Sequence, residues 1–274
     1  MRSGAFHDVL PAMRLVSRDS WSGAIRLEGE RTVAEEAAIA LTYNRSTHAV
    51  MMATPHDLDD LGVGFSLSEG IVDSVDEIEE LELIQTEDGI EVRMSLATKS
   101  RDAFNRRRRH LTGPTGCGLC GIESLAEAMR PPRRVSSAAR FSAAAITSAM
   151  AAMPRYQMLH HETHSVHAAA YCQADEGFCG IREDVGRHNA LDKLIGALAR
   201  QSIQPANGIV MVTSRVSVEL IQKTAALGAP VIVAVSAPTA LAIRACESAG
   251  ITLAAVARDD RFEVFCHGER IIAA

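Results

Sequence analysis

The chain has 274 residues, of which 47% are hydrophobic and 23% charged, the usual balance of a globular protein. Its formal net charge of −6 and its aromatic content of 4% argue against a nucleic-acid binder, because such proteins are usually basic and stack bases on aromatic rings. No apolar run approaches the ~20 residues of a membrane helix, residues 1–11 lack the apolar region of a signal peptide, and six cysteines do not make a disulfide scaffold in a chain this long. We therefore expect a cytoplasmic protein without a membrane partner, built from one large domain or two smaller ones.

The N-terminal part has the pattern of a small α+β unit. Residues 1–20 are expected to be a loose tail. Short alternating or β-branched runs then predict strands, with turns at residues 44–47 and 87–89. The strands are expected at residues 24–28, 38–43, 48–52, 78–84 and 90–96.

A helix is predicted between the third and fourth of these strands. Thr54 is a candidate N-cap, Pro55 suits the first helical position, and Asp57 completes a capping box. Apolar residues follow at helical spacing until Gly70, which ends the helix. We expect residues 21–110 to form one small α+β domain with a structural role.

The motif Thr-Gly-Cys-Gly-Leu-Cys-Gly at residues 115–121 places Cys117 and Cys120 two residues apart among three glycines. Glycine allows positive φ and close approach of another molecule, which a buried structural cysteine does not need. A free thiol has a pKa of about 8.5 and reacts as the thiolate. The helix predicted after Cys120 would lower that pKa by less than about one unit, since a helix terminus contributes roughly 0.3–1 kcal/mol. The arginine run at residues 106–109 could add positive charge, although such runs are often only solvated.

Five interpretations of the cysteine pair remain open from the motif alone. A structural zinc site needs four ligands, and no second C-x-x-C is present. A zinc deaminase needs H-x-E followed by P-C-x-x-C, but Pro114 stands three residues before Cys117. A thioredoxin-like exchanger would follow a strand, whereas the preceding segment is arginine-rich. The glycines and the basic flank favour a sulfur carrier, and inert loop cysteines are the remaining alternative.

The central part combines a helix at residues 141–153 and a strand at residues 165–171 with two polar clusters. Four histidines at 160, 161, 164 and 167 could hold a metal only if their segment were helical, and we expect no permanently bound metal. Arg187 and His188 stand at the start of a helix expected over residues 189–200. This turn could bind an anion or could be a salt-bridged helix cap.

The C-terminal third alternates continuous apolar strands at residues 208–213, 231–235 and 252–256 with helices at residues 216–227 and 238–248. This alternation predicts a parallel sheet covered by helices, so the fold class is α/β, with α+β character from the first domain. Ligands of such sheets bind beyond the carboxyl ends of the strands, where hydroxyls and arginines such as Ser214 and Arg215 follow. A phosphate or nucleotide site is expected there, without the P-loop or G-x-G-x-x-G of standard ATPases and dehydrogenases.

Taken together, these motifs resemble the FdhD family, the sulfur carrier proteins needed for formate dehydrogenase activity. The resemblance spans about residues 29–271 and includes several independent motifs in the same order. They are Thr54-Pro55, Ser68-Glu69-Gly70, the Cys117 to Gly121 segment, Asp184-Val185-Gly186-Arg187-His188-Asn189, Ser214-Arg215-Val216-Ser217 and Ala237-Pro238-Thr239. The family commonly has Thr-Gly-Gly where this chain has Thr163-His164-Ser165, and Glu-x-Pro near Glu36-Ala37-Ala38.

The resemblance implies a two-domain homodimer in which residues 111–274 form a cytidine-deaminase-like three-layer α/β domain. It also implies that a cysteine desulfurase donates persulfide sulfur to Cys117, with Cys120 assisting, and that the sulfur passes to the molybdenum or tungsten of bis(molybdopterin guanine dinucleotide) before the cofactor enters formate dehydrogenase. Segment 256–261 is implied to bind the guanine dinucleotide. The expected cofactor-binding residues are Val256, Ala257, Arg258, Asp259, Asp260, Arg261, Arg187, His188, Ser214 and Arg215.

Two other functions stay open at this point. A cofactor chaperone would bind the dinucleotide without moving sulfur, so Arg258 and Arg261 would be essential and Cys117 would not. A thiol–disulfide oxidoreductase would instead cycle Cys117 and Cys120 between two thiols and a bridge.

Overall fold

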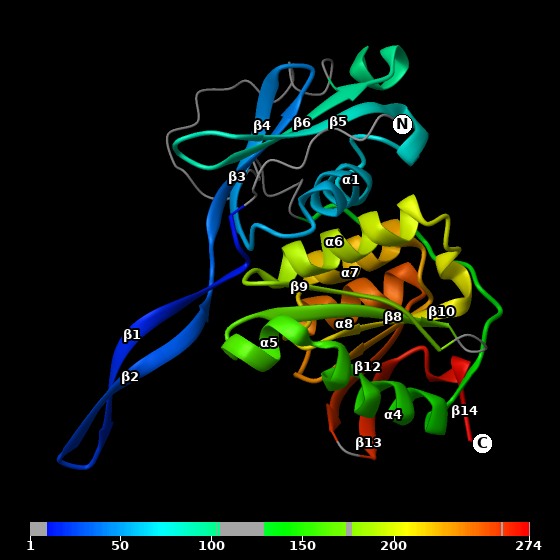
Figure 1. Cartoon of the computed structure of the whole chain (residues 1–274). Helices are drawn as coiled ribbons and strands as arrows, with labels where there is room; N and C mark the ends of the chain where they lie inside the picture. The colour runs from blue at the N-terminus through cyan, green and yellow to red at the C-terminus, as the bar shows by residue number, and fades with distance from the viewer. Residues whose placement is uncertain (1–9, 103, 105–128, 174–176, 259, 274) are drawn as a thin grey trace.

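The computed structural model describes residues 10–102, 104, 129–173, 177–258 and 260–273. It has a mixed α/β architecture, which confirms the predicted fold class, and its elements are stacked in layers (Figure 1). A four-stranded sheet is followed by helix α1, then by helices α6 and α7, by a six-stranded sheet, and by helix α4. Among the described residues no helix is long and apolar enough to cross a membrane. The predicted domain boundary at residues 110/111 lies outside the described residues.

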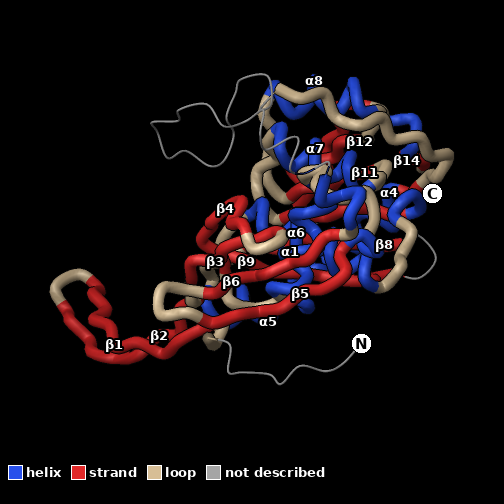
Figure 2. The backbone as a smooth tube through the Cα atoms, turned by 90° about the horizontal axis from the view of Figure 1, so that it is seen from above, coloured by secondary structure: helices blue, strands red, loops and turns tan. Residues whose placement is uncertain are grey.

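Strands β1 (Met13–Ser22) and β2 (Ile25–Ala34) form an antiparallel hairpin that extends away from the body (Figures 1 and 2). The expectation of a loose tail up to residue 20 was therefore wrong for residues 13–20. Because both faces of the hairpin meet solvent, β1 carries no regular apolar alternation that would predict a strand, whereas residues 25–28 of the strand predicted at residues 24–28 lie in β2. Trp21, for example, is 66% exposed and Leu15 is 59% exposed. Pairing of the two backbones, rather than burial, defines these strands.

The small sheet has the strand order β4-β3-β6-β5. Its strands are β3 (Ala37–Tyr43), β4 (Ser46–Ala53), β5 (Ile78–Gln85) and β6 (Ile90–Leu96), as the sequence predicts to within a few residues. Helix α1 (Leu58–Ser68) packs against it, and a 3-10 turn at Val75–Glu77 precedes β5. Ile39, Leu41, Leu61, Val92 and Met94 meet in a core of their own.

The start of α1 differs from the prediction. The helix begins at Leu58 and is preceded by Asp57 in a left-handed conformation, with no side-chain cap. Thr54 does not cap it: its backbone N–H donates to Asp184 at 3.0 Å, and its hydroxyl accepts from the N–H of Val185 at 3.1 Å. The local cap pattern was misleading because the partners of Thr54 stand about 130 residues away in the chain.

The large sheet has the order β13-β12-β11-β10-β8-β9. Its strands are β8 (His167–Gln173), β9 (Gly177–Asp184), β10 (Gly208–Val212), β11 (Val231–Ala234), β12 (Thr252–Arg258) and β13 (Arg261–Cys266). The parallel pairing of β10, β11 and β12 confirms the prediction for the C-terminal third. The remaining pairs are antiparallel, so the sheet as a whole is mixed.

Helices cover both faces of this sheet. Helices α6 (Arg187–Arg200), α7 (Val218–Leu227) and α8 (Ala240–Ala249) bury one face, and α4 (Ala143–Ala152) buries the other. Gly228 and Gly250 end α7 and α8 with φ of 88° and 71°, the left-handed geometry that glycine adopts readily. The smaller elements are α5 (Met158–Thr163), the paired strands β7 (Phe141–Ser142) and β14 (Ile271–Ile272), and 3-10 turns at Met153–Tyr156, Pro205–Asn207 and Gly268–Arg270.

Helices α1 and α6 cross in direct backbone contact. A Cβ atom added at Gly64 would overlap the backbone carbonyl of Asp192, and one added at Gly196 would overlap that of Asp60. Only glycine permits this approach, which fixes the small sheet and α1 against the α6–α8 layer.

Candidate functional site

Cys117 and Cys120 lie outside the described residues, as do the arginines at 106–109 and Asp259. The described chain resumes at Met129, beside the C-terminal end of α1. Arg130 donates to the carbonyl of Glu69 at 3.5 Å, and the Arg130 carbonyl accepts from the Gln222 amide at 2.8 Å. A pocket of about 220 Å³ lies here between the end of α1, residues 130–133 and α7.

The N-termini of α6, α7 and α8 meet at one edge of the large sheet. β9 runs parallel to β10 and β11, because β8 is antiparallel to both of its neighbours. The loops after β10 and β11 are held together by a bridge between Val216 and Pro238, and the N–H of Thr239 donates to the Val216 carbonyl at 3.0 Å. The predicted site residues that follow these strands therefore do share one edge, which we call the strand-end site.

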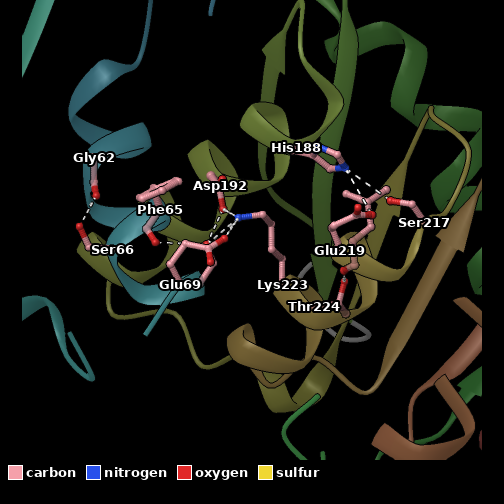
Figure 3. A network of polar contacts seen from close by, with 12 residues as sticks. Gly62, Phe65, Ser66, Glu69, His188, Asp192, Ser217, Glu219, Lys223 and Thr224 are labelled. Carbon is pink, nitrogen blue, oxygen red and sulfur yellow. Dashed lines mark hydrogen bonds and ion pairs between the residues drawn. The ribbon is translucent and has the colours of Figure 1, made fainter. Parts of the chain in front are cut away.

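His188 faces the first turn of α7 (Figure 3). Its Nε2 lies 3.4 Å from the Ser217 hydroxyl and 4.0 Å from the Glu219 carboxylate. Burial, together with the nearby positive charge of Arg187, lowers the pKa of His188 to about 4. The ring is therefore neutral at pH 7 and can both donate and accept a hydrogen bond.

Arg187 is the charged residue at the first position of α6. Burial is the main cause that lowers the pKa of His188 and of His167, and the positive charge of Arg187 is the next cause for both. Among the atoms that the structure describes, the buried Nε of Arg187 has no hydrogen-bond partner. The N-cap positions of α6 and α7, Gly186 and Ser217, provide no side-chain cap. Donors that are not paired within the described chain suit an anion such as a phosphate.

The end of β12 is irregular. Val256 has φ of 54°, an outlier for a β-branched residue, and its N–H donates to the Ser236 carbonyl at 3.4 Å. The strand pairing is interrupted here, and Arg258 opposes Arg261 at the start of β13. Strained backbone of this kind is concentrated at functional sites. Both arginines, as well as Asp260, are exposed at the same sheet edge.

Some predicted residues do not face the strand-end site. Ala257 packs on the opposite side of the sheet, with the core under α4. Ser214 is buried, and its hydroxyl donates to the Arg215 carbonyl at 3.2 Å, so it shapes its own loop. Arg215 is exposed.

The histidine cluster is partly helical, because His160 and His161 lie on α5, and the strand expected at residues 165–171 is present as β8 from His167. His160 Nδ1 lies 3.2 Å from the Val166 carbonyl, and the Glu183 carboxylate accepts the N–H groups of Leu159 and His160. Across the described ranges, no group of three or more His, Cys, Asp or Glu is placed to hold a metal ion. His164 has φ of 56°, which explains why glycine suits this position in the family pattern.

Sequence reasoning missed a set of buried ion pairs behind the strand-end site. Lys193 and Asp184 form a fully buried pair at 2.6 Å. Lys223, on the same helix as Ser217 and Glu219, points to Asp192 and Glu69, each at 2.9 Å (Figure 3). A charged residue at a helical position gives no sign in the sequence that its partner lies on another element.

The low pKa of His188 predicts a pH effect on stability. The unfolded chain takes up the proton near pH 6.5 and the folded chain only near pH 4, so this contribution is present above pH 6.5 and is lost as the pH falls between these values. The loss should be about 1–2 kcal/mol once solvent screening is allowed for, since the side chain is 34% exposed. Urea unfolding of the wild type and of His188→Gln at pH 7 and pH 4.5 measures it. Equal pH dependence in the two proteins would contradict the prediction.

Comparison with known proteins agrees with this architecture. Residues 34–272 match the model of the FdhD/NarQ family. The chain is 48% identical over 260 residues to the sulfur carrier protein FdhD of Agrobacterium fabrum, covering 94% of this chain and 96% of that protein. It is 49% identical over 239 residues to the protein of the same name from Cupriavidus necator, covering 87% of this chain and 83% of the relative.

The fold also matches a crystal structure. A protein from Desulfotalea psychrophila, proposed to be a formate dehydrogenase accessory protein, superimposes with a TM-score of 0.76 at 24% identity, covering 96% of this chain and all of that one. On the family match and the curated relatives, the chain belongs to the FdhD/NarQ family.

Proposed function

We propose that this protein is a sulfur carrier required for formate dehydrogenase activity. Its close relatives carry the name sulfur carrier protein, and the chain has the glycine-flanked pair Cys117 and Cys120. The observation that carries the proposal is the presence, on one chain of this family, of that thiol pair and of a strand-end site in which the buried Nε of Arg187 has no partner among the described residues.

In the proposed first step, the Cys117 thiolate attacks the outer sulfur of a persulfide on a cysteine desulfurase. A new S–S bond forms on Cys117, the donor S–S bond breaks, and the donor cysteine leaves as a thiolate that takes up a proton. The terminal sulfur atom would then pass to the molybdenum or tungsten of the substrate, bis(molybdopterin guanine dinucleotide). Its bond to Cys117 breaks with the electron pair left on Cys117, which takes up a proton and returns to the thiol, and the two electrons that convert the transferred sulfur to a sulfido ligand come from the metal of the substrate in its reduced state. Cys120 assists this exchange.

We propose that this substrate binds at the strand-end site. A dinucleotide cofactor is a polyanion, and arginine matches phosphate in geometry as well as in charge. Arg187, Arg258 and Arg261 would supply the charge, and the N-termini of α6 and α7 the N–H donors. The chain as a whole is acidic, so this local cluster must provide the attraction.

The Cys117→Ala substitution is expected to abolish formate dehydrogenase activation in a strain that lacks its own carrier, because it removes the thiolate that is proposed to take the sulfur. Mass spectrometry after incubation with desulfurase and cysteine should show one added sulfur atom on Cys117 of the wild type. Full activation by Cys117→Ala would overturn the proposal.

The same experiment separates the two alternatives. A cofactor chaperone would tolerate Cys117→Ala and fail with Arg258→Gln combined with Arg261→Gln, and the strand-end arginines are the feature that favours it. A thiol–disulfide oxidoreductase would lose two hydrogens and gain no sulfur.

Assembly and location belong to the same proposal. We place the sulfur transfer in the cytoplasm and expect the carrier to work as a homodimer, as the family resemblance implies. Light scattering of the purified full-length protein would show twice the chain mass, and a monomer at working concentration would contradict the dimer.

A further inference from the structure

Cys246 and Cys266 meet at the outer end of the large sheet, away from the motif cysteines in sequence. Cys246 is fully buried on α8, and Cys266 ends β13, the edge strand. Cys266 packs against the hydrophobic cluster that contains Cys246. The residues that follow the two cysteines are in contact, because His267 Nε2 lies 3.0 Å from the Glu247 carbonyl, and each thiol shifts the pKa of the other.

Backbone contacts through Ile251 hold the two cysteines in place. The Ile251 N–H donates to the Cys246 carbonyl at 3.2 Å, and the Cys266 thiol lies 3.4 Å from the Ile251 carbonyl. Cys266 also pairs with Leu253 across β12 and β13. Ile251, just before β12, therefore contacts the backbone of Cys246 and the thiol of Cys266.

We propose that Cys246 and Cys266 form a dithiol site that small disulfides, such as oxidised glutathione, convert to an intramolecular disulfide. The bridge would join α8 to the β12–β13 hairpin, which carries Arg258 and Arg261. The site is independent of the sulfur transfer proposed for Cys117.

The environments of the two thiols set the order of the steps. The neighbouring Cys246 thiol, the backbone at Leu253 and the nearby His267 lower the pKa of Cys266. The neighbouring Cys266 thiol and burial raise the pKa of Cys246. Cys266 is also the partly exposed member of the pair. It is therefore the thiol that meets the oxidant, since the thiolate is the nucleophile.

The reaction balances as two exchanges. The Cys266 thiolate, its proton given to solvent, attacks one sulfur of glutathione disulfide, and one glutathione leaves as a thiolate. Cys246 loses its proton, attacks the Cys266 sulfur and releases the second glutathione. Both leaving thiolates take up a proton, so two protein thiols are oxidised by two electrons and one disulfide is reduced to two thiols.

The test uses the full-length chain with Cys117→Ser and Cys120→Ser, so that the pair used in the proposed function cannot contribute. After incubation with oxidised glutathione, peptide mapping should show a Cys246–Cys266 cross-link and a loss of two hydrogens, reversed by dithiothreitol. The oxidised form should also melt at a higher temperature. Cys246→Ser should stop at a stable glutathione adduct on Cys266, and Cys266→Ser should leave Cys246 unmodified.

Cys172→Ser is the matched control, because Cys172 is also a buried cysteine of the large sheet, and its loss should leave the cross-link intact. Circular dichroism confirms that each variant is folded. A lasting glutathione adduct on Cys266 of the parent protein, or adducts on Cys179 alone, would overturn the proposal.

Discussion

The Gly64→Ala substitution is expected to lower the free energy of unfolding by about 3 kcal/mol, at the upper end of the range for overpacked interiors. The added methyl group would overlap the backbone carbonyl of Asp192 on α6, and a backbone carbonyl cannot rotate away as a flexible side chain can. This overlap is relieved only if α1 and α6 move apart, which weakens the packing between the two helices. Gly196→Ala should have a similar effect, because its methyl group would overlap the Asp60 carbonyl.

Urea unfolding followed by circular dichroism measures this difference. Gly180→Ala is a suitable control, since its new methyl group would meet only Leu194 Cδ1 at 3.8 Å, an ordinary contact. The control should change the free energy of unfolding by less than about 1 kcal/mol, the conformational effect of glycine itself. A Gly64→Ala protein as stable as the control would show that the two helices can separate without cost.

The elements that the sequence predicts best are strands made of consecutive buried residues. β10, β11 and β12 are runs of apolar residues between polar loops, and their order and direction follow from the helices between them. β1 was missed because its apolar residues are exposed and irregularly spaced, so they give no period to detect. The true start of α1 was missed for another reason, namely that Thr54 satisfies its hydrogen bonds with Asp184 and Val185 and not with its own helix.

The candidate site was predicted in part for the same reasons. Placing Arg187 and His188 at a helix start needs only the local pattern, and α6 does begin there. Their electrostatic state depends on contacts between elements. The ring of His188 is neutral because of its burial and the charge of Arg187. The left-handed backbone of Val256 could not be predicted either, because a β-branched residue rarely adopts it. The role of Asp184 was hidden because it joins the start of α6 to Thr54, which stands 130 residues away in the chain.

The Asp184→Ala substitution is expected to cost about 3–5 kcal/mol of folding free energy, the usual effect of leaving one partner of a buried ion pair alone. The carboxylate accepts from Lys193 at 2.6 Å, from the N–H of Thr54 at 3.0 Å, from the N–H of Gly186 at 2.7 Å and from Asn189 at 3.0 Å. Its loss leaves the ammonium of Lys193 beside the Thr54 carbonyl at 2.9 Å, an uncharged acceptor. Urea unfolding measures the difference.

Glu91→Ala is the matched control, because the Glu91–Arg93 pair is nearly as short at 2.7 Å but its arginine is 39% exposed. Its removal should cost less than about 1 kcal/mol. Adding Lys193→Met to Asp184→Ala should restore part of the lost stability, since the double variant leaves no buried charge unpaired. An Asp184→Ala protein as stable as the Glu91→Ala control would mean that water reaches Lys193 and that the pair is not sealed.

Asp184 also connects the fold to the candidate site. Asp184 binds the N-terminal turn of α6 through Gly186 and Asn189, and Arg187 and His188 lie between those two contacts. Without the carboxylate that turn should loosen, and His188 should become more exposed to water, so its pKa should rise from about 4 toward the ordinary value of about 6.5. Titration of the His188 ring by NMR in Asp184→Asn, which keeps a similar shape, tests this. An unchanged pKa would mean that α7, through Ser217 and Glu219, is enough to hold the ring in place.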